Sequence, residues 1–205
     1  MLVNREKFLN YVVNTIGNSG RAAEVGSYEG AFSKMILEKW NGFLYMVDVW
    51  TELDKAIYDD GSNQLEPNKT ISKVFENIKG YEDRTVLLRT TSYEASKLIP
   101  DNSLDFVYID ANHAYKFVKN DIIYWWPKLR VGGIFSGHDY IKDYTLEKAN
   151  ESGDTPVWMN TEDGPFYCGM FGVNKAVDGF VKKKNLKLEV VDEYFGTWYI
   201  TKEYE

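Results

Sequence analysis

The segment 104–140, LDFVYIDANHAYKFVKNDIIYWWPKLRVGGIFSGHDY, contains both histidines of the chain, and both of its apolar runs end in polar side chains. Asp110 ends the first run, and His138 and Asp139 end the second. If these runs are neighbouring parallel strands, their carboxyl ends bring the three side chains within reach of one ion. Oxygen ligands suit Mg²⁺ or Ca²⁺, and an added imidazole also admits Mn²⁺ or Fe²⁺. The pattern predicts a divalent metal site, to which we assign Mg²⁺ or Mn²⁺. The alternative is that the aspartates cap turns and His138 is an ordinary polar residue.

His113 follows Asp110 by three residues, at the expected start of a helix. A metal ion at this edge would bind a substrate hydroxyl, lower its pKa and hold the oxygen toward the reacting group. An imidazole has the near-neutral pKa that suits removal of the hydroxyl proton. His113 is therefore the candidate general base, and the alternative is that it only orders this loop.

The stretch AEVGSYEGAF places Gly26 and Gly30 in a turn between an apolar run and a helical pattern. Such a turn aims backbone N–H groups and the positive end of a helix at a ligand. A dinucleotide fingerprint, G-x-G-x-x-G, would have glycine at position 28, where this chain has Tyr28. The bulky side chain argues against a dinucleotide. Glu24 would repel a pyrophosphate but would pair with a ligand ammonium, so we expect a ligand that carries a cation.

A second carboxylate, Asp48, ends the next apolar run, FLYMVDVW. At a strand end it can accept hydrogen bonds from both hydroxyls of a ribose. Trp50 follows two residues later and can stack on a ligand ring, although plain packing explains it equally well.

Short apolar runs alternate with helical patterns from residue 20 to about residue 138, as in β-α-β units. The five runs are almost entirely apolar, which is typical of parallel strands covered on both faces. The stretch REKFLNYVVNTIG places Phe8, Tyr11, Val12 and Ile16 on one helical face, which we expect to pack on the core rather than on another subunit. The stretch LKLEVVDEYFGTWYIT predicts two antiparallel strands. We therefore predict one α/β domain over 1–205, with a Rossmann-like, mostly parallel sheet, an antiparallel C-terminal edge and helices on both faces.

AEVGSYEG resembles the first motif of the class I S-adenosylmethionine-dependent methyltransferases, and Asp48 resembles their ribose-binding acidic residue. The predicted strand order is similar to theirs through TWYIT, so the resemblance covers nearly the whole chain. It implies that the glycine turn lines the methionine end of the cofactor and that Ser92 lies near the adenine. The residues assigned to the cofactor are Glu24, Gly26, Ser27, Tyr28, Gly30, Asp48, Trp50, Ser92 and Asp110.

YIDANHAY followed by VGGIFSGHDY is similar to the metal-dependent O-methyltransferases that modify sugars in bacterial natural products, and more distantly to catechol O-methyltransferases. The resemblance implies that Asp110 and Asp139 bind Mg²⁺ and that His113 is the base, whereas His138 stands where a carboxylate is expected. The expected activity is methyl transfer from S-adenosylmethionine to a hydroxyl of a sugar-like or phenolic small molecule. The alternatives are a nicotinamide-linked oxidoreductase and a non-catalytic S-adenosylmethionine-binding protein.

The net charge of −7 and the pI of about 5.0 leave no basic surface of the size that nucleic acid requires. The single cysteine excludes an intrachain disulfide and a cysteine-based zinc site. The N-terminus lacks the apolar core of a signal peptide, and no run approaches the roughly 18 apolar residues of a membrane span. We therefore expect a cytoplasmic protein with no nucleic-acid or membrane partner, and leave a homo-oligomer open. The polar segment 141–169 is expected to be a lid or acceptor-binding loop.

Overall fold

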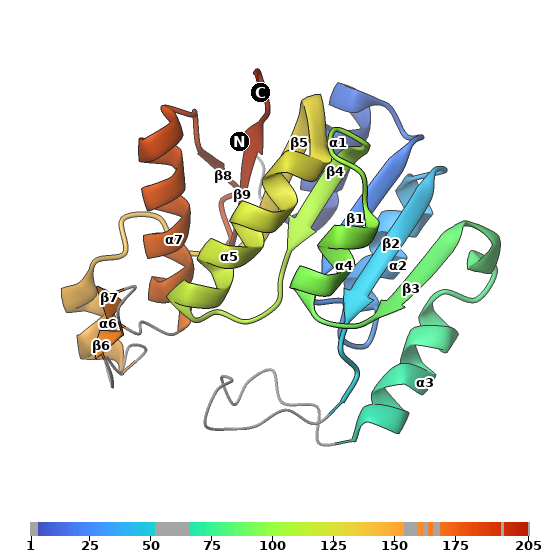
Figure 1. Cartoon of the computed structure of the whole chain (residues 1–205), viewed down its shortest axis with the longest axis horizontal. Coiled ribbons are helices and arrows are strands. Elements are labelled where there is room, and N and C mark those ends of the chain that lie inside the picture. The colour runs from blue at the N-terminus through green and yellow to red at the C-terminus, as the bar shows by residue number, and fades with distance from the viewer. Residues whose placement is uncertain are drawn as a thin grey trace.

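The central feature is a seven-stranded sheet in the order β3-β2-β1-β4-β5-β9-β8 (Figure 1). The first five strands along the chain pair in parallel, and β9 runs antiparallel between β5 and β8. This confirms the predicted fold class. The strands are β1 (Arg21–Val25), β2 (Phe43–Asp48), β3 (Thr85–Arg89), β4 (Leu104–Ile109), β5 (Leu129–Tyr140), β8 (Glu189–Val190) and β9 (Gly196–Thr201). The computed structural model describes residues 4–51, 66–153, 160–161, 164–165, 169–193 and 195–204.

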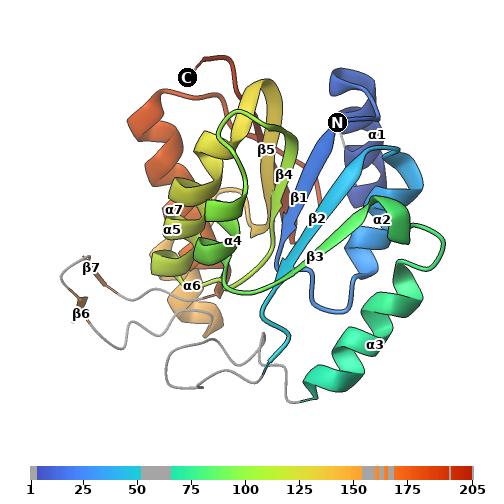
Figure 2. The ribbon, with the colours of Figure 1, turned by 45° about the vertical axis from the view of Figure 1, so that its right-hand side comes forward.

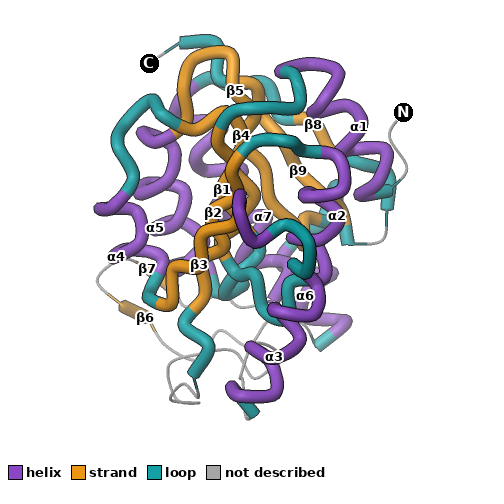
Figure 3. Tube along the Cα trace, turned by 90° about the vertical axis from the view of Figure 1, so that its right-hand side faces the viewer, coloured by secondary structure: helices purple, strands orange, loops and turns teal. Residues whose placement is uncertain are grey.

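Helices cover both faces of the sheet, with α4 and α5 on one side and α1 and α2 on the other (Figures 2 and 3). One hydrophobic cluster packs α4, α5 and α7 on the sheet, and a second packs α1, α2 and α3 on the opposite face. The helices are α1 (Arg5–Ile16), α2 (Ala31–Lys39), α3 (Pro67–Asn77), α4 (Ser92–Leu98), α5 (Tyr115–Trp125), α6 (Leu146–Ser152) and α7 (Gly169–Lys184), with short 3₁₀ turns η2 (Glu82–Arg84) and η3 (Trp126–Lys128). None of these described helices is long and apolar enough to cross a membrane.

The strand β4 shows why the strands are apolar on both faces. Phe106 and Tyr108 pack with the cluster under α1 and α2, whereas Val107 and Ile109 pack with the cluster under α4 and α5. All four side chains are buried, as expected for a strand with helices on both sides.

The N-terminal helix α1 packs on the core, as predicted. It begins after Asn4, whose side chain accepts a hydrogen bond from the Lys7 backbone N–H at 2.9 Å, a common N-cap arrangement. Phe8 and Val12 of the predicted face are buried, and Leu9 is buried with them. This packing fixes the position of the first residue of α1, which matters for the site below.

The segment after β5, predicted as a lid or acceptor-binding loop over 141–169, contains some regular structure. Leu146–Ser152 form α6. Thr145 caps its start and Gly153, in the left-handed conformation, ends it. Further on, β6 (Asn160–Thr161) and β7 (Gly164–Pro165) form a two-stranded pair. Residues 154–159, 162–163 and 166–168 of the predicted lid lie outside the described residues.

Candidate active site

A cavity of about 800 Å³ opens at the carboxyl ends of β1, β2, β4 and β5. The sheet order reverses between β1 and β4, and this is where open α/β sheets bind their ligands. Its size falls in the range of small-molecule and cofactor sites. Of the predicted site residues, those that line it are Glu24, Gly26, Ser27, Tyr28, Asp48, Ser92, Asp110, His113, His138 and Asp139.

The glycine turn after β1 requires Gly26. This residue has a φ of 94°, and a Cβ there would lie 2.1 Å from the backbone oxygen of Asp110. The close approach lets the first turn pack against the start of the loop after β4. Gly30, also assigned to the cofactor, has positive φ and is the N-cap of α2, but it does not line the cavity.

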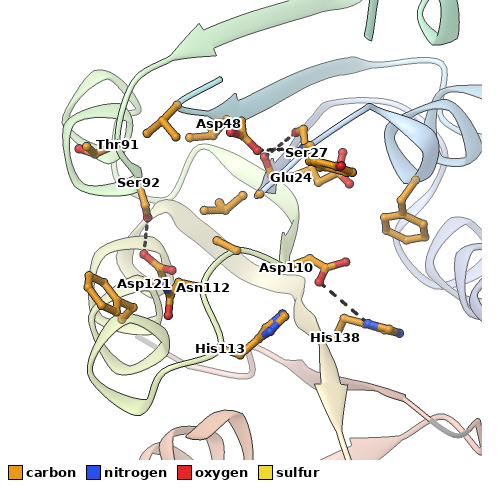
Figure 4. Close-up of a pocket in the computed structure, with 18 of the residues that line it drawn as sticks. Glu24, Ser27, Asp48, Thr91, Ser92, Asp110, Asn112, His113, Asp121 and His138 are labelled. Atoms are coloured by element: carbon orange, nitrogen blue, oxygen red, sulfur yellow. Dashed lines mark hydrogen bonds and ion pairs between the residues drawn. The ribbon is translucent and has the colours of Figure 1, made fainter. Parts of the chain in front are cut away.

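Asp48 holds the glycine turn through its carboxylate (Figure 4). One oxygen accepts the Tyr28 backbone N–H at 2.8 Å, and the other accepts the Trp50 backbone N–H at 3.0 Å. The Trp50 indole N–H in turn donates to the Tyr28 carbonyl at 2.7 Å. Tyr28 and Trp50 both have φ in the left-handed region, at 45° and 42°, which is costly for side chains of this size. The three residues therefore stabilise one another.

Trp50 is fully buried and does not line the cavity. This position contradicts the assignment of Trp50 to the cofactor and agrees with the alternative, plain packing. Its indole packs in the core and donates a hydrogen bond to the carbonyl of Tyr28, so it stabilises the glycine turn from the core side.

Glu24, which the resemblance assigns to the methionine end of the cofactor, lines the cavity. Its side chain is 2% exposed, and the Ser33 hydroxyl donates a hydrogen bond to it. Burial raises the pKa of Glu24 to about 8, against the opposing effect of the Ser33 hydrogen bond. The carboxyl is thus neutral near pH 7 until a cation approaches it.

The opposite end of the cavity holds a polar network that the sequence did not reveal. Asp121 of α5 accepts a hydrogen bond from the Ser92 hydroxyl (Figure 4). The Trp125 indole N–H donates to the Ser92 hydroxyl oxygen at 2.9 Å. Burial raises the pKa of Asp121 to about 7, and its hydrogen bond with Ser92 opposes this. The predicted Ser92 therefore acts together with a buried acid. The pattern AYKFVKNDIIYWW would have drawn attention to Asp121 as a lone carboxylate among the apolar positions of a helix.

The two histidines and two aspartates come together at the ends of β4 and β5. His113 Nε2 lies 2.9 Å from Asp139 Oδ2, and His138 Nδ1 lies 3.1 Å from Asp139 Oδ1. His138 Nδ1 is 3.9 Å from Asp110 Oδ1. The pairing of β5 with β9 shifts register between Gly137 and Tyr140, and a bulge of this kind re-aims side chains at a sheet edge.

The pKa values of the two aspartates are displaced in opposite directions, although the histidines lower both. Burial opposes ionisation of Asp139, but hydrogen bonds with His113 and His138 outweigh it and hold the pKa well below its usual range. Burial raises the pKa of Asp110, against the attraction of His138. Among the described residues, ligand atoms of Asp110, His113 and Asp139 all lie within 4.8 Å of one another. The structure thus brings together all four residues of the predicted metal and base assignments. His113, predicted as the base, lies close enough to the two carboxylates to be a metal ligand as well.

Arg5 is a further cavity residue that sequence reasoning missed. It is the first residue of α1 and shares the face of the buried Phe8 and Leu9, one turn earlier. Its guanidinium lies 3.5 Å from Asp110 Oδ2 and 5.1 Å from the centre of the Phe32 ring. The helical spacing alone would have placed Arg5 toward the sheet.

A family model described as a methyltransferase domain matches residues 23–140, more than half of the chain. The chain belongs to the class I methyltransferases. It is therefore an enzyme of methyl transfer, and the nicotinamide-linked oxidoreductase is excluded. No curated protein matches the sequence at a significant level.

Solved structures of other methyltransferases share the fold. A proposed rRNA methylase from Clostridium thermocellum has a TM-score of 0.64 at 12% identity, with 98% of each chain covered. A proposed caffeoyl-CoA O-methyltransferase from Staphylococcus aureus has a TM-score of 0.62 at 14% identity, with 98% of this chain and 85% of the other covered. A Podospora anserina methyltransferase bound to S-adenosylhomocysteine has a TM-score of 0.61 at 14% identity, covering 96% and 77%. At these identities the likeness concerns the fold alone.

Proposed function

We propose that this methyltransferase transfers the methyl group of S-adenosylmethionine to a hydroxyl of a small molecule, sugar-like or phenolic, assisted by a divalent cation. The observation that carries the proposal is the cluster of Asp110, His113 and Asp139, which lines the same cavity as the glycine turn. Two carboxylates and an imidazole beside a cofactor site suit the activation of an oxygen nucleophile.

The cavity fits the cofactor at both ends. In this proposal Glu24 meets the methionine end of the cofactor and Asp48 meets the ribose. Ser92 and Asp121, which share a hydrogen bond, meet the adenine end. The volume of about 800 Å³ leaves room for a small acceptor beside the cofactor. The relative from Podospora anserina that holds S-adenosylhomocysteine supports the same ligand here.

The acidic cluster also fits a divalent cation by the chemistry of its donors. Asp110 and Asp139 supply hard oxygen ligands, and His138 Nδ1 lies 3.9 and 3.1 Å from them. Mg²⁺ and Mn²⁺ both accept such a set. When bound, the ion supplies Lewis acidity, which lowers the pKa of the acceptor hydroxyl.

His113 would take the hydroxyl proton. Its side chain is 26% exposed and lines the cavity, so an acceptor can reach it. Asp139, 2.9 Å from Nε2, orients the ring and stabilises the imidazolium that forms when the ring takes up the proton. The same closeness permits His113 to act as a metal ligand, and the two roles give different results when His113 is replaced.

The charge of the protein favours a small-molecule acceptor over RNA. The net charge is −7, and six carboxyl groups line the cavity, whereas a phosphate backbone requires basic surface. An acceptor that is neutral or cationic near the reacting atom meets no such repulsion.

The test is a methyl-transfer assay with hydroxylated acceptors, with Mg²⁺, Mn²⁺ or a chelator, alongside calorimetric titration of S-adenosylhomocysteine. Asp139→Ala or the chelator should abolish turnover and leave S-adenosylhomocysteine affinity nearly unchanged, because Asp139 is not among the residues assigned to the cofactor. Asp101→Ala, a change of an exposed carboxylate far from the cavity, is the matched control. Full activity in the chelator would contradict the metal assignment, and absence of cofactor binding would contradict the proposal as a whole.

A further inference from the structure

Arg5 carries donors that the described part of the protein does not satisfy. A guanidinium has five N–H donors in a fixed plane. In the described residues the side chain makes one ion pair, with Asp110 at 3.5 Å, and lies over the rings of Phe32 and Tyr108 at 5.1 and 6.0 Å. No hydrogen bond from it to a described residue is present, although the side chain is only 28% exposed. Arg5 lines the cavity, so its guanidinium N–H groups are available to bind an anion there.

The charges around the cavity make this arginine distinctive. Six carboxyl groups line it, and Arg5 is the one permanently charged cation among the described lining residues. The acidic residues are Glu24, Glu29, Asp48, Asp110, Asp121 and Asp139. An anionic group that enters this cavity therefore finds a permanent positive charge among the described lining residues only beside Arg5.

The cofactor of the proposed function brings such a group. The methionine end of S-adenosylmethionine carries an ammonium and a carboxylate on one carbon. Its site therefore needs an acidic side chain for the ammonium and a cationic side chain for the carboxylate, close together. Arg5 and Glu24 line the same cavity, and their charges interact. Phe32, in the first turn of α2 after the glycine turn, lies under the guanidinium and places it at this end of the cavity rather than beside Ser92.

We propose that Arg5 binds the α-carboxylate of S-adenosylmethionine, while Glu24 accepts its ammonium. The assignment rests on the proposed function. It makes the N-terminal helix part of the cofactor site, so that the packing of Phe8 and Leu9 on the sheet also positions the residue that reads the amino-acid group. Guanidinium and carboxylate form paired, charge-assisted hydrogen bonds, which the long Arg5 contact with Asp110 leaves room for.

The experiment compares S-adenosylmethionine with its decarboxylated form, which keeps the ammonium and the sulfonium and lacks only the carboxylate. Both are titrated by calorimetry into the native protein, Arg5→Gln, Arg5→Lys and Lys7→Gln. Lys7 is an exposed cation on the same helix, so its replacement is the matched control for charge. Thermal unfolding of each variant checks that α1 still packs.

Arg5→Gln should weaken S-adenosylmethionine binding about 10 to 100 fold, the loss expected for a hydrogen bond between charged groups, and should leave the decarboxylated form nearly unchanged. Arg5→Lys should recover part of the loss, and Lys7→Gln should have no effect. An equal loss for both ligands would overturn the proposal and leave Arg5 a purely structural role. Unchanged cofactor affinity with a raised acceptor KM would also overturn it, in favour of the acceptor. If the native protein bound neither ligand, the proposed function would fail first, and the Arg5 assignment with it.

Discussion

Replacing Glu24 by glutamine should stabilise the ligand-free protein at alkaline pH and weaken its cofactor binding. Glu24 is 2% exposed, and its pKa is raised from its ordinary value of 4.5 to about 8, chiefly by burial. Glutamine has the same shape and can still accept the hydrogen bond from Ser33. The variant therefore removes the ionisation and little else.

The sign follows from proton binding in the two states. Between pH 4.5 and about 8 the unfolded chain has released the Glu24 proton and the folded protein retains it, so stability falls as the pH rises. The loss is about 1.4 kcal/mol per pH unit and is complete above pH 8. Over this interval it is on the order of 5 kcal/mol. Below pH 4.5 both states hold the proton, and this residue causes no change.

The measurement is urea unfolding of the native protein and Glu24→Gln at several values between pH 5 and 9, with the difference in free energy of unfolding plotted against pH. Titrating groups that do not interact with Glu24 cancel in that difference. We expect the free energy of unfolding of the variant, relative to that of the native protein, to increase steadily up to about pH 8 and then to stay constant. A difference that does not vary with pH would refute the reasoning, since it would mean that Glu24 ionises in the folded protein as it does in the unfolded chain.

The same residue should link cofactor binding to proton release. If the ammonium of S-adenosylhomocysteine pairs with ionised Glu24, binding at pH 6.5 must expel the proton that the ligand-free protein holds. Calorimetry in two buffers of different ionisation enthalpy would report that proton. Glu24→Gln should release none and should bind more weakly, so the residue lowers stability where it contributes to binding.

Three further outcomes follow from the geometry. Asp48→Ala should weaken S-adenosylhomocysteine binding by about 1.5 to 3 kcal/mol, whereas Trp50→Phe, which keeps the carboxylate, should lose much less; equal calorimetric losses would mean that Asp48 acts only through the turn. Gly26→Ala should destabilise the protein well beyond Gly153→Ala in urea unfolding, because both have positive φ but only Gly26 has backbone within 2.1 Å of a new Cβ. His113→Ala should keep its metal, measured by mass spectrometry, and slow turnover about 10² to 10⁴ fold, with partial recovery at higher pH; loss of the metal would make His113 a ligand instead.

The sheet could be predicted from the sequence because its signals are local. Each parallel strand is a short apolar run, and the polar residue that ends the run reports the edge at which ligands bind. This reasoning correctly placed Glu24, Asp48 and Asp110 around one cavity. For Trp50 the sequence left stacking on a ligand and plain packing both open, because a position beside a strand end does not fix side-chain direction. In the structure the residue has a left-handed φ of 42° and its indole is buried in the core.

The residues that were missed lie on helices and reach the cavity through tertiary packing. Arg5 is separated from Asp110 by more than a hundred positions, and their contact depends on how α1 crosses the sheet, which no local pattern specifies. Asp121 reaches Ser92 because α4 and α5 pack side by side. Strand ends thus determine where a ligand binds, while the covering helices supply groups that distinguish one ligand from another. In this methyltransferase the two kinds of residue meet at Asp110, which ends β4 and pairs with the N-terminal helix.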